Sequence, residues 1–269
     1  MAKKIGLALG GGAARGLAHI GVLEVFEKEG VPIDIVAGTS AGAIIGALHA
    51  AGVSAAKMKK YVLDFNSARR RRMVDLTLPK SGFINGDKII REMVKLMGGD
   101  RSFDELKKPF ACVACDILRG EEVILNSGRV SDAVHASISV PIIFNAVKLE
   151  GRYLVDGGIV NQIPVSVVKS MGAEFVIGVN VVPLHTRRIS SPGSDEGDQP
   201  GLMTVMLNTI DIANSCRAET SLAGVDIVIS PNTASLKPVD FAKADEFILQ
   251  GEMAAIDALL AIKRHMTRW

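Results

Sequence analysis

Short apolar runs alternate along the chain with longer segments whose apolar positions recur at the spacing of a helix. These longer segments are polar on one face: within residues 14–29, Glu24, Glu27 and Lys28 fall at i, i+3 and i+4. The apolar runs predict strands at residues 5–9, 34–37, 110–118, 121–125, 153–155, 175–182 and 225–229. Helices are predicted at residues 14–29, 41–51, 130–139, 165–171, 202–222 and 241–265.

Strands that alternate with helices predict an α/β fold, in which the helical connections bring successive strands back to one sheet. We expect a three-layer α/β/α sandwich with a mostly parallel central sheet. One hairpin interrupts the alternation, because only Arg119 and Gly120 separate two neighbouring apolar runs. Residues 66–86 and 190–201 are rich in turn-forming residues, and we predict irregular structure there.

Composition narrows the class of protein. The chain has 269 residues, and we expect one domain over residues 1–269. Contents of 48% hydrophobic and 22% charged residues exclude disordered, collagen-like and disulfide-scaffold proteins. A formal net charge of +2 gives no reason to expect nucleic acid as the main partner. The three cysteines, an odd number in a long chain, favour a reducing compartment.

Two segments resemble membrane-targeting sequences without meeting their requirements. Two lysines precede the apolar residues 5–9, but glycines and Arg15 end that run before it reaches the length of a signal peptide. Residues 35–56 contain no Asp, Glu, Lys or Arg and are long enough to cross a bilayer. Because Thr39, Ser40 and several glycines interrupt this segment, we expect a buried strand, a turn and a helix in a cytoplasmic protein.

A G-x-S-x-G pattern lies where an apolar strand gives way to an apolar helix. Residues 38–42 spell Gly-Thr-Ser-Ala-Gly, and a serine in a sharp strand-to-helix turn has an exposed hydroxyl. Gly38 and Gly42 allow the backbone to bend, and the helix start places partial positive charge near Ser40. The pattern indicates a nucleophile, with an ordinary helix N-cap serine as the alternative.

A glycine-rich loop follows the first predicted strand. Residues 10–16 spell Gly-Gly-Gly-Ala-Ala-Arg-Gly, and glycines there expose backbone N–H groups to an anion. A phosphate loop, an oxyanion hole and a close-packing turn are the three interpretations. The dinucleotide fingerprint fails because Ala13 or Arg15 occupies a required glycine, and no Gly-Lys-Ser/Thr follows. A nearby nucleophile favours the oxyanion hole.

An acidic residue ends another predicted strand. Asp156, Gly157 and Gly158 directly follow the apolar residues 153–155. A carboxylate followed by two glycines is typical of a turn. It also fits a base that lies close to Ser40 and leaves room for a substrate.

In this order, the three motifs resemble the patatin-like phospholipase family, and are most similar to its bacterial members and to the catalytic domain of neuropathy target esterase. The resemblance extends from about residue 4 to residue 182 and includes residues 17–23 and 161–164. Residues 201–269 carry less diagnostic helices and strands.

The resemblance implies a patatin-like fold and a hydrolase of lipid acyl esters, of phospholipase A or lysophospholipase type, that needs no metal or organic cofactor. It implies that Ser40 is the nucleophile and that Asp156 accepts its proton in a Ser–Asp dyad. The other implied site residues are the oxyanion-hole residues Gly10, Gly11, Gly12 and Ala13, the loop supports Arg15 and Gly16, and the motif glycines Gly38, Gly42, Gly157 and Gly158. Ala13 departs from the family pattern, because many relatives have a further glycine there.

Two alternatives to a hydrolase with a Ser–Asp dyad remain open. An ordinary Ser-His-Asp triad would need a histidine after the acid, and only His185 and His265 follow Asp156. A protein without catalytic activity would use residues 10–16 to bind a nucleotide or phosphate. The arginines at residues 69–72 are predicted to be a solvated surface, with peripheral contact to anionic lipid at the inner membrane surface as the alternative.

The remaining chemistry-bearing residues favour structural roles. Cys112 and Cys115 lie in one predicted strand, where a spacing of three puts the thiols on opposite faces, so we expect packing rather than zinc binding. His19, His49 and His135 fall in predicted helices. No pair of histidines has a metal-binding spacing such as H-x-x-x-H.

Overall fold

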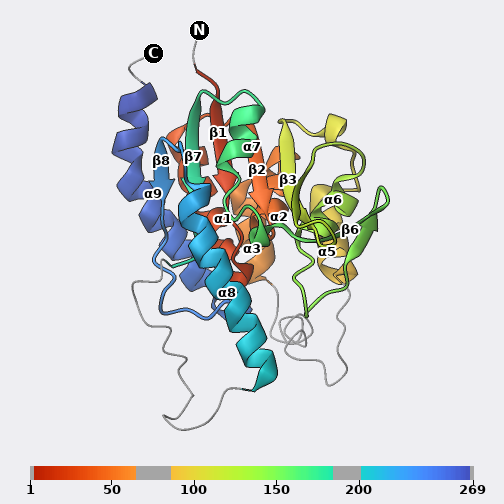
Figure 1. The fold of residues 1–269 in the computed structure, drawn as a ribbon. Coiled ribbons are helices and arrows are strands. Elements are labelled where there is room, and N and C mark those ends of the chain that lie inside the picture. The colour runs from red at the N-terminus through yellow and green to blue at the C-terminus, as the bar shows by residue number, and fades with distance from the viewer. Residues whose placement is uncertain (1–2, 65–85, 184–200, 267–269) are drawn as a thin grey trace.

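The computed structural model describes residues 3–64, 86–183 and 201–266 (Figure 1). Most of the two segments predicted to be irregular, including the arginines at residues 69–72, lies outside the described residues. His185 lies outside them as well.

The described residues form one mixed sheet with helices on both faces. The strands are β1 (Ile5–Leu9), β2 (Ile35–Thr39), β3 (Phe110–Asp116), β4 (Glu121–Leu125), β5 (Val147–Leu149), β6 (Arg152–Asp156), β7 (Phe175–Val179) and β8 (Ile227–Ile229). Their order is β5-β6-β3-β2-β1-β7-β8, and β4 pairs with β3. The pairings among β3, β2, β1, β7 and β8 are parallel, whereas β4, β5 and β6 pair antiparallel. The predicted α/β/α sandwich and the hairpin of β3 and β4 are confirmed.

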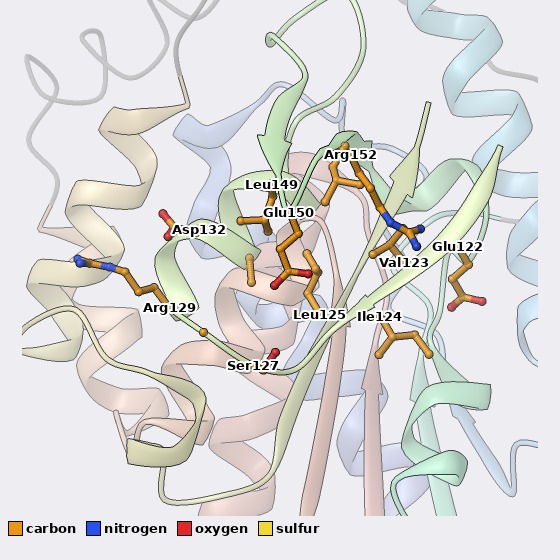
Figure 2. A pocket seen from close by; sticks show the side chains of 13 residues that line it. Glu122, Val123, Ile124, Leu125, Ser127, Arg129, Asp132, Leu149, Glu150 and Arg152 are labelled. Atoms are coloured by element: carbon orange, nitrogen blue, oxygen red, sulfur yellow. The ribbon is translucent and has the colours of Figure 1, made fainter. Parts of the chain in front are cut away.

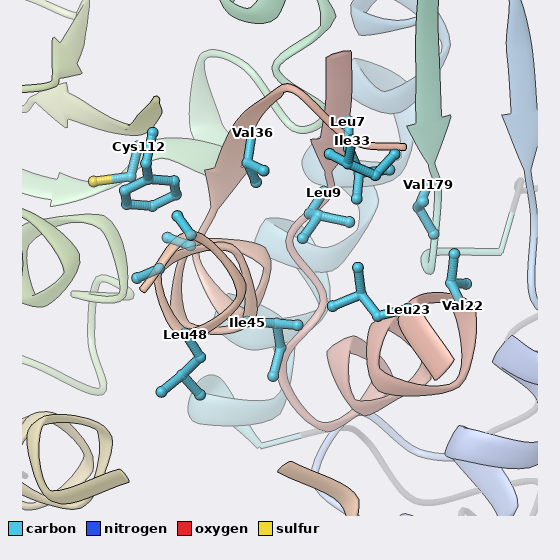
Figure 3. Close-up of a cluster of buried hydrophobic side chains, with 14 of the residues drawn as sticks. Leu7, Leu9, Val22, Leu23, Ile33, Val36, Ile45, Leu48, Cys112 and Val179 are labelled. Carbon is cyan, nitrogen blue, oxygen red and sulfur yellow. The ribbon is translucent and has the colours of Figure 1, made fainter. Parts of the chain in front are cut away.

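More helices cover one face of the sheet than the other. They are α1 (Ala18–Glu29), α2 (Ala41–Ala50), α3 (Ala55–Leu63), α5 (Asp87–Met97), α6 (Val130–Ser137), α7 (Val165–Ser170), α8 (Leu202–Ser221) and α9 (Ala244–Met266). Helices α7 and α8 pack on one face and the others on the opposite face. Figure 3 shows Leu7 and Leu9 of β1 facing Leu23 of α1 and Ile45 of α2. Because β1 is buried on both faces, its sequence is continuously apolar rather than alternating.

Several elements differ from the prediction. The helix predicted to begin at residue 14 starts as a 3₁₀ turn, η1 (Ala13–Leu17), before α1. Helices α3 and α5 and the short strand β5 were not predicted. In α3 only Ala55 and Met58 are buried, so its sequence shows little apolar periodicity. Residues 35–56 contain β2 and α2, as predicted, and no helix of the described residues is long and apolar enough to cross a membrane.

Strand β3 brings the ends of two other strands together. Its residue Val113 pairs with Thr39, the last residue of β2, and the next residue, Ala114, pairs with Asp156, the last residue of β6. Strand β4 pairs with Cys112 through Asp116 on the other edge of β3. Strands β2 and β6 therefore occupy one edge of β3 end to end, and their carboxyl ends meet.

The C-terminal helix α9 packs closely on α1. A Cβ atom at Gly251 would lie 1.9 Å from the Ala18 carbonyl oxygen, and one at Gly21 would lie 2.0 Å from the Ile248 carbonyl oxygen. Only glycine allows the two backbones to approach so closely. This contact fixes which face of α9 points toward the sheet.

Candidate active site

Ser40 lies in a strained turn between β2 and α2. Its φ of 54° and ψ of −121° place a non-glycine residue outside the regions that L-residues favour, at a cost of about 1–3 kcal/mol. The residue is buried, with 8% of its surface exposed. On the preceding residue, Thr39 Oγ1 donates a hydrogen bond to the Asn161 carbonyl oxygen at 2.9 Å. The turn is thus held by neighbouring elements despite its strain.

The glycines around Ser40 are required by close packing. A Cβ atom at Gly38 would lie 2.3 Å from the Gly42 carbonyl oxygen. One at Gly42 would lie 2.1 Å from the Leu9 carbonyl oxygen at the end of β1. The G-x-S-x-G pattern therefore lies at a strand-to-helix turn, as predicted, and its glycines are required by close packing.

The end of helix α6 holds both predicted catalytic residues. The backbone N–H of Ser40 donates to Ser137 Oγ at 3.0 Å, and Ser137 Oγ donates to the Val113 carbonyl oxygen at 2.6 Å. The backbone N–H of Asp156 donates to the Ser139 carbonyl oxygen at 2.9 Å. Nothing in the local sequence pattern indicated these serines, because their partners are distant in the chain.

Asp156 ends β6 as a buried carboxyl group. Its Oδ1 accepts a hydrogen bond from the Gly158 N–H at 2.8 Å, whereas Oδ2 has no hydrogen-bond partner in the described part of the chain. Burial raises the pKa of Asp156 to about 6, although the nearby Ser40 hydroxyl and the Gly158 amide favour the charged form. The Ser40 hydroxyl thus favours the charged form of the Asp156 carboxyl group, and burial opposes it.

The glycine loop offers fewer free amides than predicted. The N–H of Gly10 donates to the Val179 carbonyl oxygen and that of Gly11 to the Gln162 carbonyl oxygen, both at 3.1 Å. These two amides extend the bonding of β1 to its neighbours, so they are not available to an oxyanion in this conformation. Within the described residues, the Gly12 and Ala13 amides have no hydrogen-bond partner. The four predicted donors are thus reduced to two.

Ala13 adopts a backbone conformation that favours glycine. Its φ of 51° lies in the left-handed region, which disfavours residues with a Cβ atom. An alanine at this position therefore introduces local strain into the loop but keeps its backbone N–H.

Three buried residues support the loop. Arg15 Nη1 donates to Asp211 Oδ1 of α8 at 2.9 Å. A Cβ atom at Gly16 would lie 2.4 Å from the Ala41 Cβ, so η1 packs directly on the start of α2. His19 Nε2 donates to the Gly10 carbonyl oxygen at 2.8 Å, and burial lowers the pKa of His19 to about 4, which keeps the ring neutral. The supporting positions predicted for Arg15 and Gly16 agree with these contacts, whereas that of His19 was missed.

Further polar groups gather beside Gly158. Gln162 Nε2 donates to the Gly11 carbonyl oxygen at 2.9 Å, and its Oε1 has no partner in the described residues. A Cβ atom at Gly158 would lie 2.6 Å from Gln162 Oε1 and 3.2 Å from Asn214 Oδ1 of α8. A Cβ atom at Gly157 would lie 2.3 Å from the Val113 carbonyl oxygen. The β3 backbone therefore requires glycine at position 157, whereas a side chain at position 158 would meet the movable end of the Gln162 side chain.

The described histidines form no hydrogen bond with Ser40 or Asp156. His265, near the end of α9, packs its ring against Phe175 at a centroid distance of 5.0 Å. Phe175 begins β7, whereas Ser40 follows the end of β2, which runs parallel to β7 through β1. His265 therefore lies near the amino ends of the parallel strands, whereas Ser40 lies at their carboxyl ends.

Two of the cysteines lie in the central sheet. Cys112 and Cys115 are free and buried in β3. Burial raises the pKa of both thiols. In the described ranges, no group of three or more His, Cys, Asp or Glu side chains is placed to hold a metal ion.

A cavity of about 550 Å³ lies next to the site but is separate from it (Figure 2). Leu125, Leu149 and Leu154 form part of its apolar wall, while Glu150 and Arg152 are charged groups at its border. Neither Ser40 nor Asp156 lines this cavity, although β6 and α6 contribute to both.

An α/β sheet with a strained serine in a G-x-S-x-G turn is the arrangement found in serine hydrolases. The chain belongs to the patatin-like phospholipase family, whose model matches residues 7–169. Family membership supports a hydrolase that acts on lipids.

Similar proteins agree with this assignment. An uncharacterized NTE family protein of Mycobacterium bovis is 27% identical over 97% of this chain and 92% of its own length. Lysophospholipase NTE1 of Debaryomyces hansenii is 31% identical over 99% of this chain but only 18% of its own length. The crystal structure of VipD from Legionella pneumophila has the same fold, with a TM-score of 0.56 and 12% identity over 97% of this chain and 67% of that chain.

Proposed function

We propose that this protein hydrolyses acyl ester bonds of phospholipids or lysophospholipids, with Ser40 as nucleophile and Asp156 as its base. The observation that carries the proposal is the meeting of these two residues at one edge of β3. A strained serine lies there beside a buried carboxyl group whose Oδ2 has no other hydrogen-bond partner in the described residues.

In the acylation step, Ser40 Oγ attacks the ester carbonyl carbon while its proton moves to Asp156 Oδ2. The carbonyl oxygen becomes an oxyanion, which the amides of Gly12 and Ala13 bind together with the N-terminus of α2. The tetrahedral intermediate then breaks the bond to the leaving alcohol, which takes the proton from Asp156. A covalent acyl-Ser40 ester remains.

In the deacylation step, a water molecule attacks the acyl carbon and transfers a proton to Asp156. The fatty acid leaves, and Ser40 Oγ takes the proton back from Asp156. No histidine is needed at any point. An aspartate suits this role when its pKa is close to the working pH, and burial raises the pKa of Asp156 to about 6.

The lipid class of the substrate rests on the relatives. The yeast proteins that match this chain are named lysophospholipases, and each aligns over nearly the whole chain. We infer that a lysophospholipid or phospholipid is the substrate and that the alcohol released is the glycerol-phosphate part of that lipid.

The test compares substitutions at the proposed dyad with substitutions at the histidines that could complete a triad. Ser40→Ala and Asp156→Asn are each expected to abolish hydrolysis of a lysophospholipid and of a soluble ester. Ser40→Ala is also expected to abolish labelling by a fluorophosphonate. His185→Gln and His265→Gln are expected to retain most activity.

A melting curve for each variant serves as the control for folding. A folded histidine variant as inactive as Asp156→Asn would replace the dyad with a triad. A wild-type protein that binds inorganic phosphate but hydrolyses no ester would favour the alternative of a binding protein without catalytic activity.

A further inference from the structure

The outer face of α9 carries a stripe of exposed apolar side chains. Leu249, Met253, Ile256 and Leu260 are between 51% and 62% exposed. Their spacing of four, three and four residues places them in one line along the helix. Single exposed apolar residues are ordinary, but an aligned series of this length suggests a contact surface.

The packing of α9 prevents the stripe from turning inward. The opposite face of the helix buries Phe247, Ile248, Gly251, Ala255 and Ile262 against the rest of the protein. The backbone contact between α9 and α1 at Gly251 leaves no room for the helix to rotate. In Figure 1, α9 (dark blue) runs along one side of the molecule, where its outer face is open to a partner.

The spacing of the stripe matches the seam of a two-helix coiled coil. Alternating steps of four and three residues are the repeat that packs one helix side by side with another. From Leu249 to Leu260 the stripe extends about 16 Å along the helix axis. A partner that offers the same repeat would fit the stripe over its whole length, and a second copy of α9 offers it by definition.

The sequence of α9 favours an antiparallel pair. The stripe is symmetric about the midpoint between Met253 and Ile256, so reversing one helix places these two residues opposite each other and Leu249 opposite Leu260. The next layer outward places Glu246 opposite Lys263. These two charged residues also form ion pairs within their own chain, with Lys243 at 3.4 Å and Glu29 at 2.6 Å.

The charges at the helix ends disfavour the parallel arrangement. The first turn of α9 contains Asp245 and Glu246, and the last turn contains Lys263, Arg264 and His265. A parallel pair would bring like charges together at both ends, whereas an antiparallel pair brings acidic and basic ends together. Antiparallel helix dipoles favour the same arrangement.

We propose that α9 joins two copies of this chain as an antiparallel helix pair, with a two-fold axis between Met253 and Ile256. The interface is isologous, because each stripe serves as the partner of the other. Its apolar part is short, so the dimer is expected to dissociate on dilution. This inference does not depend on the proposed catalytic residues.

The first experiment measures the mass of the full-length protein by sedimentation over a range of concentrations. The wild type is expected to change from monomer to dimer as its concentration rises. Leu260→Glu places two charges in the apolar seam and is expected to give a monomer at all concentrations, with hydrolysis of a soluble ester retained. Ile212→Glu, on the exposed face of α8, is the matched control and is expected to leave the dimer intact.

The second experiment tests the orientation by disulfide formation in a Cys216→Ser background, which removes the exposed native thiol. An antiparallel pair places residue 249 beside residue 260 of the second copy, so Leu249→Cys with Leu260→Cys is expected to form a covalent dimer under mild oxidation. Leu249→Cys alone is expected to run as a monomer on a non-reducing gel, because in the antiparallel pair its two copies lie about 16 Å apart.

Any one of four results would overturn the proposal. The wild type could remain a monomer throughout the concentration range, or Leu260→Glu could dimerise like the wild type. Efficient crosslinking of Leu249→Cys alone would indicate a parallel pair. Binding of a monomeric protein to neutral phosphatidylcholine vesicles that Leu260→Glu abolishes would assign the stripe to a lipid surface instead.

Discussion

The hydroxyl group of Ser137 accepts a hydrogen bond from the backbone N–H of Ser40 at 3.0 Å. The same hydroxyl donates to the Val113 carbonyl oxygen of β3, so one buried side chain fastens the serine turn to the sheet. Because the turn is strained, it depends on such contacts to keep its conformation.

Removing this hydroxyl should misplace the nucleophile. We expect Ser137→Ala to lower kcat for a soluble ester about tenfold, because an unpaired buried amide costs about 1–3 kcal/mol and can relax by moving the turn. Ser139→Ala is the control, since it removes a buried hydroxyl from the same helix end but keeps the Ser139 carbonyl that binds Asp156. Equal rates for the two variants would contradict a positioning role for Ser137.

The rate of hydrolysis should depend on pH through Asp156. Only the carboxylate form can accept the serine proton, and burial raises the pKa of Asp156 to about 6. We therefore expect kcat/KM for a soluble ester to rise with pH and to reach half its maximum near pH 6. A profile that is flat from pH 5 to pH 8 would show that this carboxyl group is not the base.

The same pKa shift has a consequence for stability. Below about pH 3 the carboxyl group is largely neutral in both states, but as the pH rises the unfolded chain loses its proton before the folded protein does. The free energy of unfolding should therefore fall between about pH 4 and pH 6, by about 3 kcal/mol for a pKa raised from 3.8 to about 6.

Asp156→Asn should remove this fall in the free energy of unfolding, because the amide group stays neutral at every pH. Denaturant unfolding is expected to find the variant more stable than the wild type at pH 8 and about equally stable at pH 3. Asp116→Asn is the control and is expected to lower the free energy of unfolding at pH 8. Arg119 lowers the pKa of Asp116, so the charged carboxylate is favourable in the folded protein. Destabilisation by Asp156→Asn at pH 8 would contradict the raised pKa.

The strain at Ala13 can be tested by restoring glycine. Ala13→Gly removes the Cβ atom from a left-handed conformation and is expected to raise the free energy of unfolding by about 1 kcal/mol. Ala254→Gly, in the ordinary helix α9, should lower it by about 1 kcal/mol. Thermal and denaturant unfolding of both variants measure the difference. A loss of stability at both positions would mean that residue 13 is not held in this conformation.

Local patterns in the sequence predicted much of the fold and the centre of the site. Continuous apolar runs marked the central strands, and the glycines around Ser40 marked its turn because their spacing reflects contacts within a few residues. The position of Asp156 at the end of a strand was predicted for the same reason. Its proximity to Ser40 in space came from the family resemblance and not from any local pattern.

Contacts between distant segments account for what the sequence did not predict. The amides of Gly10 and Gly11 are occupied because the carbonyl oxygens of Val179 and Gln162 come within reach once the sheet has assembled. The roles of Ser137 and Asp211 depend in the same way on partners far along the chain. Such pairings leave no periodicity in the sequence.

The end-to-end arrangement of β2 and β6 along β3 limits how the distance between Ser40 and Asp156 can change. Each strand is locked to β3 by its hydrogen bonds, so β6 can shift only in whole residues, each about 3.3 Å long. A shift of one residue would also turn the Asp156 side chain to the other face of the sheet. The separation of the two groups therefore changes in discrete steps, and insertions or deletions within β6 should abolish activity rather than adjust it.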